Sequence, residues 1–459
     1  MDFSEAYTDR CSSVGHAARR GDIKSLRKLI KKGCSVDVPD NRGWMPIHEA
    51  AFSNAAQCLQ LLISSAPSQS YIKSKTFEGE SALHLAAKCG SVWCTELLLQ
   101  AGADPNDLTN DETTPLFLAV ESGCGDLVRL LLKFKANVNG PHSCSGWNPL
   151  HQASLMERTD LIQLLLESGV DKECEDDFGI RPLFIAAQYG KYESLNLLLS
   201  HGADVNCQAK DKATPLFIAA QEGHEKCTEL LLSKGADPNL YCNDEAWQLP
   251  IHAAAQMGRS KHSNMAPLLL KYGLKLSSLY LQNCLEYNNF PLFRYFLSQH
   301  CPLPSGDELD AFKQQSSKSH HKEWLPYLLL AGLDAAYLLD ATWIRSVNDD
   351  ILNFTLEFTN WKRLSADVEL LLSTHAEYFT WIPQKHFESF PPLQHLCRLQ
   401  IRSILTTERL RSKDYICQLP IPSCLQKYLL YANVLSLYGI SREDSFQENK
   451  LENITQGSD

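Results

Sequence analysis

A motif that recurs about every 33 residues constrains this 459-residue chain more than any other feature. Each copy begins with a proline or alanine followed by a leucine, and a short alanine-rich stretch comes next. A leucine triplet and then a glycine follow in the second half of the copy. The prolines Pro115, Pro149, Pro182 and Pro215 lie 33 or 34 residues apart. A unit this short cannot bury its own apolar face, so the repeat predicts units that stack into a solenoid.

Two helices are predicted in each unit. Proline suits the first turn of a helix, where its missing N–H needs no partner, and the alanines keep this inner helix slim. The leucine triplets at 97–99, 130–132, 164–166, 197–199 and 230–232 give the outer helix its buried face. The glycine that follows suits the left-handed residue that ends a helix. The sequence therefore predicts an all-α fold.

The spacing is irregular at one place. From the glycine that ends the inner helix to the glycine that ends the outer helix, regular units span 12 residues, as from Gly190 to Gly202. The corresponding pair Gly258 and Gly273 is 15 residues apart, and Pro267 stands where the outer helix should form. Two interpretations stay open, an irregular outer helix or a splice junction that joins parts of two repeats.

The rest of the chain is predicted to be helical as far as about residue 432. We divide the whole chain into four parts. These are repeats over 10–275, degenerate repeats over 276–335, a helical cap or connector over 336–385 and a C-terminal module over 386–432. The clearest helical segments of the connector are Ile351–Phe358 and Val368–Leu372. Residues 441–459 are polar and acidic without periodicity and are predicted to be disordered.

Charge and cysteine usage exclude several classes of protein. A net charge of −11 argues against a nucleic-acid binder, which needs a basic surface. The 16 cysteines include no Cys-x-x-Cys pair, so neither a zinc module nor a redox pair is predicted, and we expect no cofactor. Without an apolar leader or a run of about 18 apolar residues, we expect no membrane insertion. We predict a cytoplasmic protein with reduced thiols, and nuclear presence is not excluded.

Two short segments near the C-terminus look suited to binding other proteins. Leu393, Cys397 and Ile401 are four residues apart on a predicted helix, and each step of four advances a helix by roughly 40°. They therefore share one narrow stripe, with Leu396 and Leu405 beside it. The second segment, Leu419-Pro-Ile-Pro422, cannot be helical, because its prolines fix φ and favour an extended chain.

Four arginines in this module could suggest a nucleic-acid contact. Without a wider basic field, we predict that they lie on a solvated or partner-facing helix surface. These are Arg398, Arg402, Arg409 and Arg411.

Aromatic residues next to the inner helices are candidates for binding a target protein. Trp44, Trp147 and Trp247 lie just before or around the start of an inner helix, and Tyr189 lies at the end of one. Tryptophan is enriched where interfaces gain most of their affinity. The alternative, that each tryptophan covers the edge of its own repeat, stays open. Gln188, Gln221, Glu222 and Met257 are weaker candidates for the same surface.

The repeats resemble ankyrin repeats. Thr114-Pro-Leu-Phe-Leu-Ala, Asn148-Pro-Leu-His-Gln-Ala and Thr214-Pro-Leu-Phe-Ile-Ala match the characteristic core. The C-terminal segments resemble the elongin-binding box and the cullin box of a SOCS box. Together they make the chain similar to the ankyrin repeat and SOCS box family. This resemblance implies a solenoid of helix pairs with projecting β-turn loops, followed by a small three-helix SOCS box, the C-terminal module over 386–432.

The resemblance also implies a function. Members of this family are substrate-recognition adaptors of cullin–RING ubiquitin ligases, and they promote ubiquitination and proteasomal degradation of a bound target. By this resemblance Leu393 would fill a hydrophobic pocket on elongin C of the elongin B/elongin C pair, with Leu396, Cys397 and Ile401 beside it. Leu419, Pro420, Ile421 and Pro422 would select cullin-5 with its RING partner. The target protein stays unidentified.

Two alternatives remain beside the ligase adaptor. The chain could be an ankyrin scaffold outside any ligase, with the C-terminal helices as a cap of the stack. A cap predicts both boxes packed inward, whereas a docking module leaves Leu393 and Cys397 exposed. An enzyme is the third possibility, and no residue pattern supports it, so we expect a non-catalytic subunit.

Overall fold

The computed structural model describes residues 11–139, 143, 145–242, 248–257, 264–305, 308–309, 320–359, 364–378, 393–405, 409–410, 413–437 and 440. It contains two compact units, Met1–Pro250 and Ile251–Asp459, and each is described by itself below. In the described residues every regular element is a helix, and the β-pairing there amounts to the isolated bridges Lys75–Ser81 and Cys242–Gln248. The predicted all-α fold is confirmed.

The first unit is a row of helix pairs. The inner helices are α1 (Ser13–Arg19), α3 (Pro46–Phe52), α6 (Ala82–Lys88), α8 (Pro115–Glu121), α10 (Pro149–Leu155), α12 (Pro182–Gln188) and α14 (Pro215–Glu222). The outer helices are α2 (Ile23–Lys31), α4 (Ala56–Ser64), α7 (Val92–Gln100), α9 (Gly125–Lys133), α11 (Thr159–Glu167), α13 (Tyr192–Ser200) and α15 (Glu225–Ser233). The short helix α5 (Gln69–Ile72) lies in the longer exit loop of the second pair.

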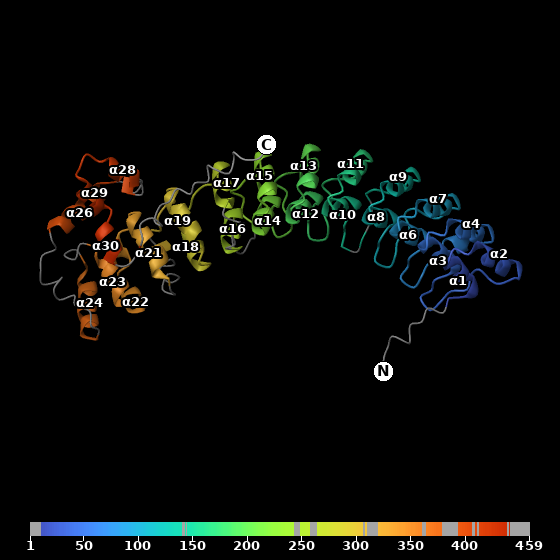
Figure 1. The fold of residues 1–459 in the computed structure, drawn as a ribbon, viewed down its shortest axis with the longest axis horizontal. Coiled ribbons are helices and arrows are strands. Elements are labelled where there is room, and N and C mark those ends of the chain that lie inside the picture. Colours follow the sequence, from blue (N-terminus) through green and yellow to red (C-terminus); the bar gives the residue numbers. More distant parts are fainter. Residues whose placement is uncertain are drawn as a thin grey trace. The chain divides into compact units, whose positions relative to one another are not determined.

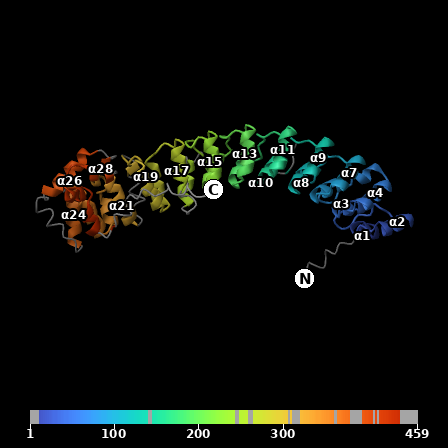
Figure 2. The ribbon, with the colours of Figure 1, turned by 45° about the horizontal axis from the view of Figure 1, so that its top comes forward.

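From α3 to α12, each inner helix packs between the inner helices before and after it. Figure 1 shows α6, α8, α10, α12 and α14 side by side, with the outer helices in a parallel row, and the same two rows are visible in Figure 2. Ala86 and Ala87 of α6 are fully buried, which allows the neighbouring backbones to approach closely. Because each pair buries its face against its neighbours, the stability of the row is a sum over adjacent units.

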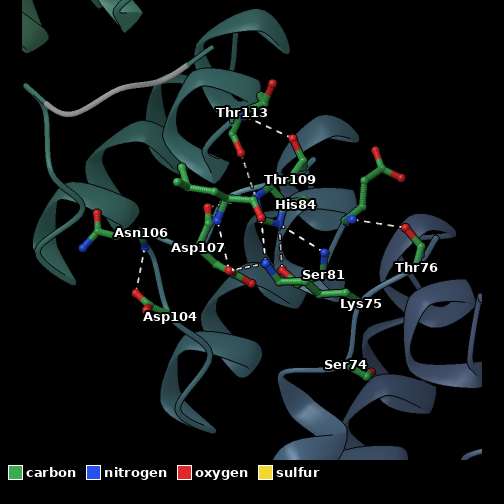
Figure 3. Close-up of polar contacts among 12 residues, drawn as sticks. Ser74, Lys75, Thr76, Ser81, His84, Asp104, Asn106, Asp107, Thr109 and Thr113 are labelled. Carbon is green, nitrogen blue, oxygen red and sulfur yellow. Dashed lines mark hydrogen bonds and ion pairs between the residues drawn. The ribbon is translucent and has the colours of Figure 1, made fainter. Parts of the chain in front are cut away.

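Histidines at the third position of three inner helices join each repeat to the next loop. His84 Nδ1 accepts a hydrogen bond from the Ser81 backbone N–H at 3.1 Å, which satisfies a free donor at the helix start. Its Nε2 therefore carries the proton and donates to the carbonyls of Asp107 and Thr113, both at 3.0 Å (Figure 3). His48 and His151 repeat the arrangement, with Ser74 and Ile180 as the acceptors.

The burial of these histidines predicts a dependence of stability on pH. Desolvation lowers the pKa of His48 to about 4, so the folded state keeps this side chain neutral where the unfolded chain would take up a proton. The stabilising contribution is complete above about pH 6.5 and is lost as the pH falls toward 4, up to about 3 kcal/mol for this residue. We expect the free energy of unfolding by urea to drop by about 2 kcal/mol more between pH 7 and pH 5 in the wild type than in His48→Phe.

Phenylalanine is a suitable control, because Phe117, Phe184 and Phe217 stand at the same position of three other repeats. An equal pH dependence in wild type and His48→Phe would contradict the assignment.

The second unit continues with helices. They are α16 (Pro250–Met257), α17 (Met265–Lys271), α18 (Leu279–Glu286), α19 (Phe290–Ser298), α21 (His321–Leu330), η3 (Ala335–Tyr337), α22 (Ala341–Ser346), α23 (Asp349–Leu356), α24 (Ala366–Tyr378), α26 (Leu393–Ile404), α28 (Lys413–Gln418), α29 (Ser423–Leu429) and α30 (Ala432–Leu437). Large aromatic side chains fill its core, and the fully buried ones include Trp324, Trp343, Phe293 and Phe296.

An outer helix forms at the irregular repeat. Pro267 is the third residue of α17, within the first turn, where a backbone N–H has no partner inside the helix. This helix has 7 residues, against 9 in the outer helices of the first unit such as α15. Residues 258–263, where the proposed junction would lie, are outside the described residues, as is the predicted tail 441–459. The division into domains stays a prediction.

Candidate functional site

Helix α26 of the second unit has an open face and a buried face. His395, Arg398 and Arg402 are buried, whereas Cys397, Ser403 and Ile404 are exposed. The helix thus packs against its own unit on one side and leaves an apolar stripe on the other. Such a stripe can bind a complementary apolar groove in another protein.

The open face carries most of the predicted docking residues. Cys397 is exposed, Ile401 is 42% exposed, and Leu396 is half-buried at the edge of the stripe. Leu393 opens the helix, and its side chain lies outside the described part of the structure. The predicted stripe is therefore present at the surface wherever its side chains are described.

Ile404 extends this stripe and was missed in the sequence. It is 70% exposed, and it lies seven residues after Cys397, which places the two roughly 20° apart around the helix. The spacing of three from Ile401 and seven from Cys397 is a helix-face pattern that would have identified it. We define the docking stripe as Cys397, Ile401 and Ile404.

The prediction for the arginines is wrong for two of the four. Arg398 and Arg402 point inward and are 3% and 8% exposed, because their guanidinium groups find carbonyls, a carboxylate and aromatic rings within the unit. Arg409 is exposed, as predicted for a solvated arginine, and Arg411 lies outside the described residues.

The proline segment lies between α28 and α29 in an extended turn. The Ile421 N–H donates to the Leu419 carbonyl at 2.7 Å across Pro420, and Pro422 precedes the first turn of α29. Leu419 and Ile421 are half-buried against a small cluster that includes Ile416 and Leu429. Pro420 and Pro422 are exposed. The four residues predicted to bind cullin thus divide into two that support the fold and two that are free to contact a partner.

Trp44, Trp147 and Tyr189 lie in the first unit, Met257 belongs to the second, and Trp247 is outside the described residues. Trp44 packs edge-on against Phe52 at the end of α3, with ring centroids 5.3 Å apart, and Arg42 lies 4.3 Å from its centroid. Trp147 donates its indole N–H to Asp176 at 3.1 Å and stacks on His151. Tyr189 is 50% exposed.

The contacts of Trp147 fit a role at the edge of two repeats. Trp44 is half-buried like Trp147, and Tyr189 is the exposed one of the three. Two residues at the loop tips were missed, Phe77 and Phe178, both among the most exposed aromatic side chains of the first unit. Each lies within two residues before a glycine that turns the loop, a position that could have marked them.

The described residues contain no group of three or more His, Cys, Asp or Glu side chains that could hold a metal ion. In the same part of the chain no helix is long and apolar enough to cross a membrane.

Two protein families match this chain. The family of ankyrin repeats (3 copies) matches residues 14–109, 101–176, 158–242 and 183–280. The SOCS box family matches residues 389–430, which contain α26, α28 and α29. Helix α30 begins just beyond the matched segment.

Similar proteins cover nearly the whole chain. Human ankyrin repeat and SOCS box protein 3 is 52% identical over 518 positions, covering 98% of this chain and 100% of the relative. Its bovine counterpart is 51% identical and covers 99% and 100%. The human match extends over 59 positions more than the 459 residues of this chain, so that relative has segments that this chain lacks. The splice junction stays one of the two interpretations of the irregular repeat at 258–273.

Solved structures of ankyrin repeat domains match part of this chain. The ankyrin repeat domain of human ASB11 is 25% identical, covering 57% of this chain and 99% of that domain, with a TM-score of 0.42. The ankyrin repeat domain of Bcl-3 is 24% identical over 49% of this chain and 99% of that domain, with a TM-score of 0.43.

Proposed function

This chain belongs to the ankyrin repeat and SOCS box family, and we propose that it is the substrate receptor of an elongin–cullin-5 ubiquitin ligase. Its SOCS box makes it a SOCS-box adaptor of cullin ligases, and the identity of the partners is the part that we propose. In this proposal the docking stripe binds elongin C of the elongin B/elongin C pair, and the proline segment selects cullin-5 with its RING partner. We place the protein in the cytoplasm.

The observation that carries the proposal is the exposed docking stripe. Cys397, Ile401 and Ile404 form an apolar surface on a helix whose opposite face is buried. An apolar stripe on a helix surface costs solubility unless a partner covers it. The partner that the family suggests is elongin C, which would cover the stripe with an apolar groove.

The scaffold alternative predicted that the C-terminal helices pack inward as a cap. Helix α26 does bury one face in its own unit, through His395, Arg398 and Arg402. A cap does not require its other face to be apolar and open, so the exposed Cys397 favours the docking function. The two functions belong to two faces of one helix.

The adaptor contributes proximity and no chemistry of its own. Holding a target beside a charged conjugating enzyme raises the effective concentration of the target's lysines. The loop tips and inner-helix ends of the first unit, including Trp44, Phe77 and Tyr189, are the surface that we propose for the target.

Co-purification with purified elongin B/elongin C and cullin-5 tests the proposal. We expect the wild-type chain to retain both, and failure to retain the elongins would overturn the assignment.

A variant of the proline segment separates cullin binding from elongin binding. Because Pro420 and Pro422 are exposed while Leu419 and Ile421 are half-buried, Pro420→Ala/Pro422→Ala changes the accessible surface with little loss of core. We expect at least about a tenfold weaker capture of cullin-5, the equivalent of about 1.4 kcal/mol, with elongin capture unchanged. Leu419→Ala is the control for damage to the fold. Unchanged cullin-5 capture by the double variant would remove this role from the segment.

A further inference from the structure

The buried face of α26 carries three polar side chains where an apolar face is expected. His395, Arg398 and Arg402 are all less than a tenth exposed. Buried charges are costly unless they are paired, so their presence requires an explanation. We propose that Arg398 and Arg402 are positioning residues that fix the SOCS box in one orientation on the helices that precede it. The inference rests on the proposed function, to which it adds a geometric requirement.

Arg402 joins three helices. Its Nη1 donates to the Leu429 carbonyl at 3.1 Å, and its Nη2 donates to the carbonyls of Leu329 and Leu330 at 3.3 and 2.9 Å. These residues end α29 and α21, where carbonyls have no partner inside the helix. The planar guanidinium is a fixed fork of donors, so the three bonds form together only when α21, α26 and α29 hold one relative arrangement.

Arg398 ties α26 to the end of α23. It lies 3.8 Å from the ring centroid of Tyr431 and 4.3 Å from that of Tyr428, and it forms an ion pair with Glu357 at 3.5 Å. The Tyr431 ring in turn stacks on Phe358, with centroids 3.9 Å apart.

His395 adds a second bond to the same segment, from its Nε2 to the Thr359 carbonyl at 2.9 Å. Residues 357–359 directly follow α23, so the aromatic stack and this bond hold α26 from two sides.

This arrangement is built for a defined geometry more than for stability. Nε and Nη1 of Arg398 are buried without a hydrogen-bond partner among the described residues, and so is the Tyr431 hydroxyl. Tyr431 also adopts a left-handed backbone with φ of 55°, which is unfavourable for a residue with a side chain. An apolar residue in place of Arg398 would avoid the cost of its two unpaired nitrogens.

Apolar packing leaves the orientation under-determined at this place. A pocket of about 710 Å³ opens beside Arg402, and residues of α26, of the α21–η3 connection and of the α23 end line it. Its lining includes Leu333, Phe358, Leu396 and Arg402. Because shape complementarity does not fill this region, directional bonds of the arginines decide how the SOCS box sits. In a ligase this orientation sets which lysines come within reach of the conjugating enzyme.

The test uses Arg398→Met and Arg402→Lys in the full-length chain. Methionine keeps an apolar contact with the tyrosine rings without the charge, and lysine keeps a charge that cannot reach three carbonyls at once. Arg409→Met makes the same change at an exposed arginine of the same module and serves as the control. Arg398→Lys, which keeps the charge without the planar stack, replaces Arg398→Met if that variant does not fold.

Three measurements are made on each variant. We expect the affinity for elongin B/elongin C to stay within about twofold of wild type, since the docking stripe is on the other face. Small-angle scattering of the chain alone should show a wider distribution of dimensions. In the reconstituted ligase, mass spectrometry should find the chain's own ubiquitinated lysines spread over more positions, with the main site of the wild type losing at least half of its share. Arg409→Met should match wild type in all three.

Wild-type scattering and an unchanged lysine pattern in folded variants would overturn the inference. A loss of elongin affinity that parallels the other changes would overturn it too, because the arginines would then act in docking. If the wild type itself fails to bind elongins, the proposed function fails, and the scattering of the chain alone still decides whether the arginines fix the orientation.

Discussion

Cys397→Arg is expected to abolish capture of elongin B/elongin C while the chain stays folded. Cys397 is exposed at the N-terminal end of the docking stripe, so a large charged side chain fits there in the free protein. In a complex the same guanidinium would be buried against an apolar groove without a partner. We expect at least about a hundredfold loss of affinity, equivalent to about 2.7 kcal/mol, measured by calorimetry with the purified elongin pair.

Ser403→Arg is the matched control for this experiment. Ser403 is exposed on the same helix, and it lies roughly 120° around the axis from Cys397. We expect the affinity of Ser403→Arg for the elongin pair to stay within about threefold of wild type. Ile404→Arg should lie between Ser403→Arg and Cys397→Arg, with about a tenfold loss of affinity. Equal affinities for Cys397→Arg and Ser403→Arg would show that the stripe is not the elongin-binding surface.

Arg402→Met is expected to destabilise the C-terminal helices strongly. The substitution leaves the buried carbonyls of Leu329, Leu330 and Leu429 without their common donor. The Leu329 carbonyl still accepts from the Gly332 N–H at 3.1 Å, so the carbonyls of Leu330 and Leu429 are the ones most affected. Each unsatisfied acceptor costs about 1–3 kcal/mol, so we expect a loss of about 3–5 kcal/mol in local stability. In hydrogen exchange, peptides of α21 and α29 should exchange at least about a hundredfold faster, while those of the first unit stay unchanged.

Arg409→Met again provides the control, since it removes an exposed guanidinium. Its exchange rates should equal those of the wild type. Slow exchange of α21 and α29 in Arg402→Met would mean that other donors satisfy these carbonyls.

Local sequence patterns predicted the repeats well, because every contact that defines them is close in the chain. The prolines at the helix starts and the leucine triplets fix each pair, and the pair packs against copies of itself. The same reasoning placed Cys397 and Ile401 on one stripe, since the spacing on a helix is a local property.

The buried face of α26 could not be predicted in this way. Arg402 finds its acceptors at Leu329 and Leu330, more than 70 residues earlier in the chain. An isolated arginine next to a docking stripe is most simply explained by solvent, and only the packing of α21 and α29 against α26 provides carbonyls for it. By sequence alone Pro267 argues against an outer helix, because its place in the first turn depends on where α17 begins.

The histidine bonds between repeats bear on how such a chain can change in evolution. His84 reaches the next loop through its main-chain carbonyls, and His48 and His151 do the same. Every residue type has a carbonyl, so a repeat that moves to a new neighbour finds the same acceptors there. Whole repeats can therefore be gained or lost by recombination while the joints between them still match, which is consistent with a relative that has more residues than this chain.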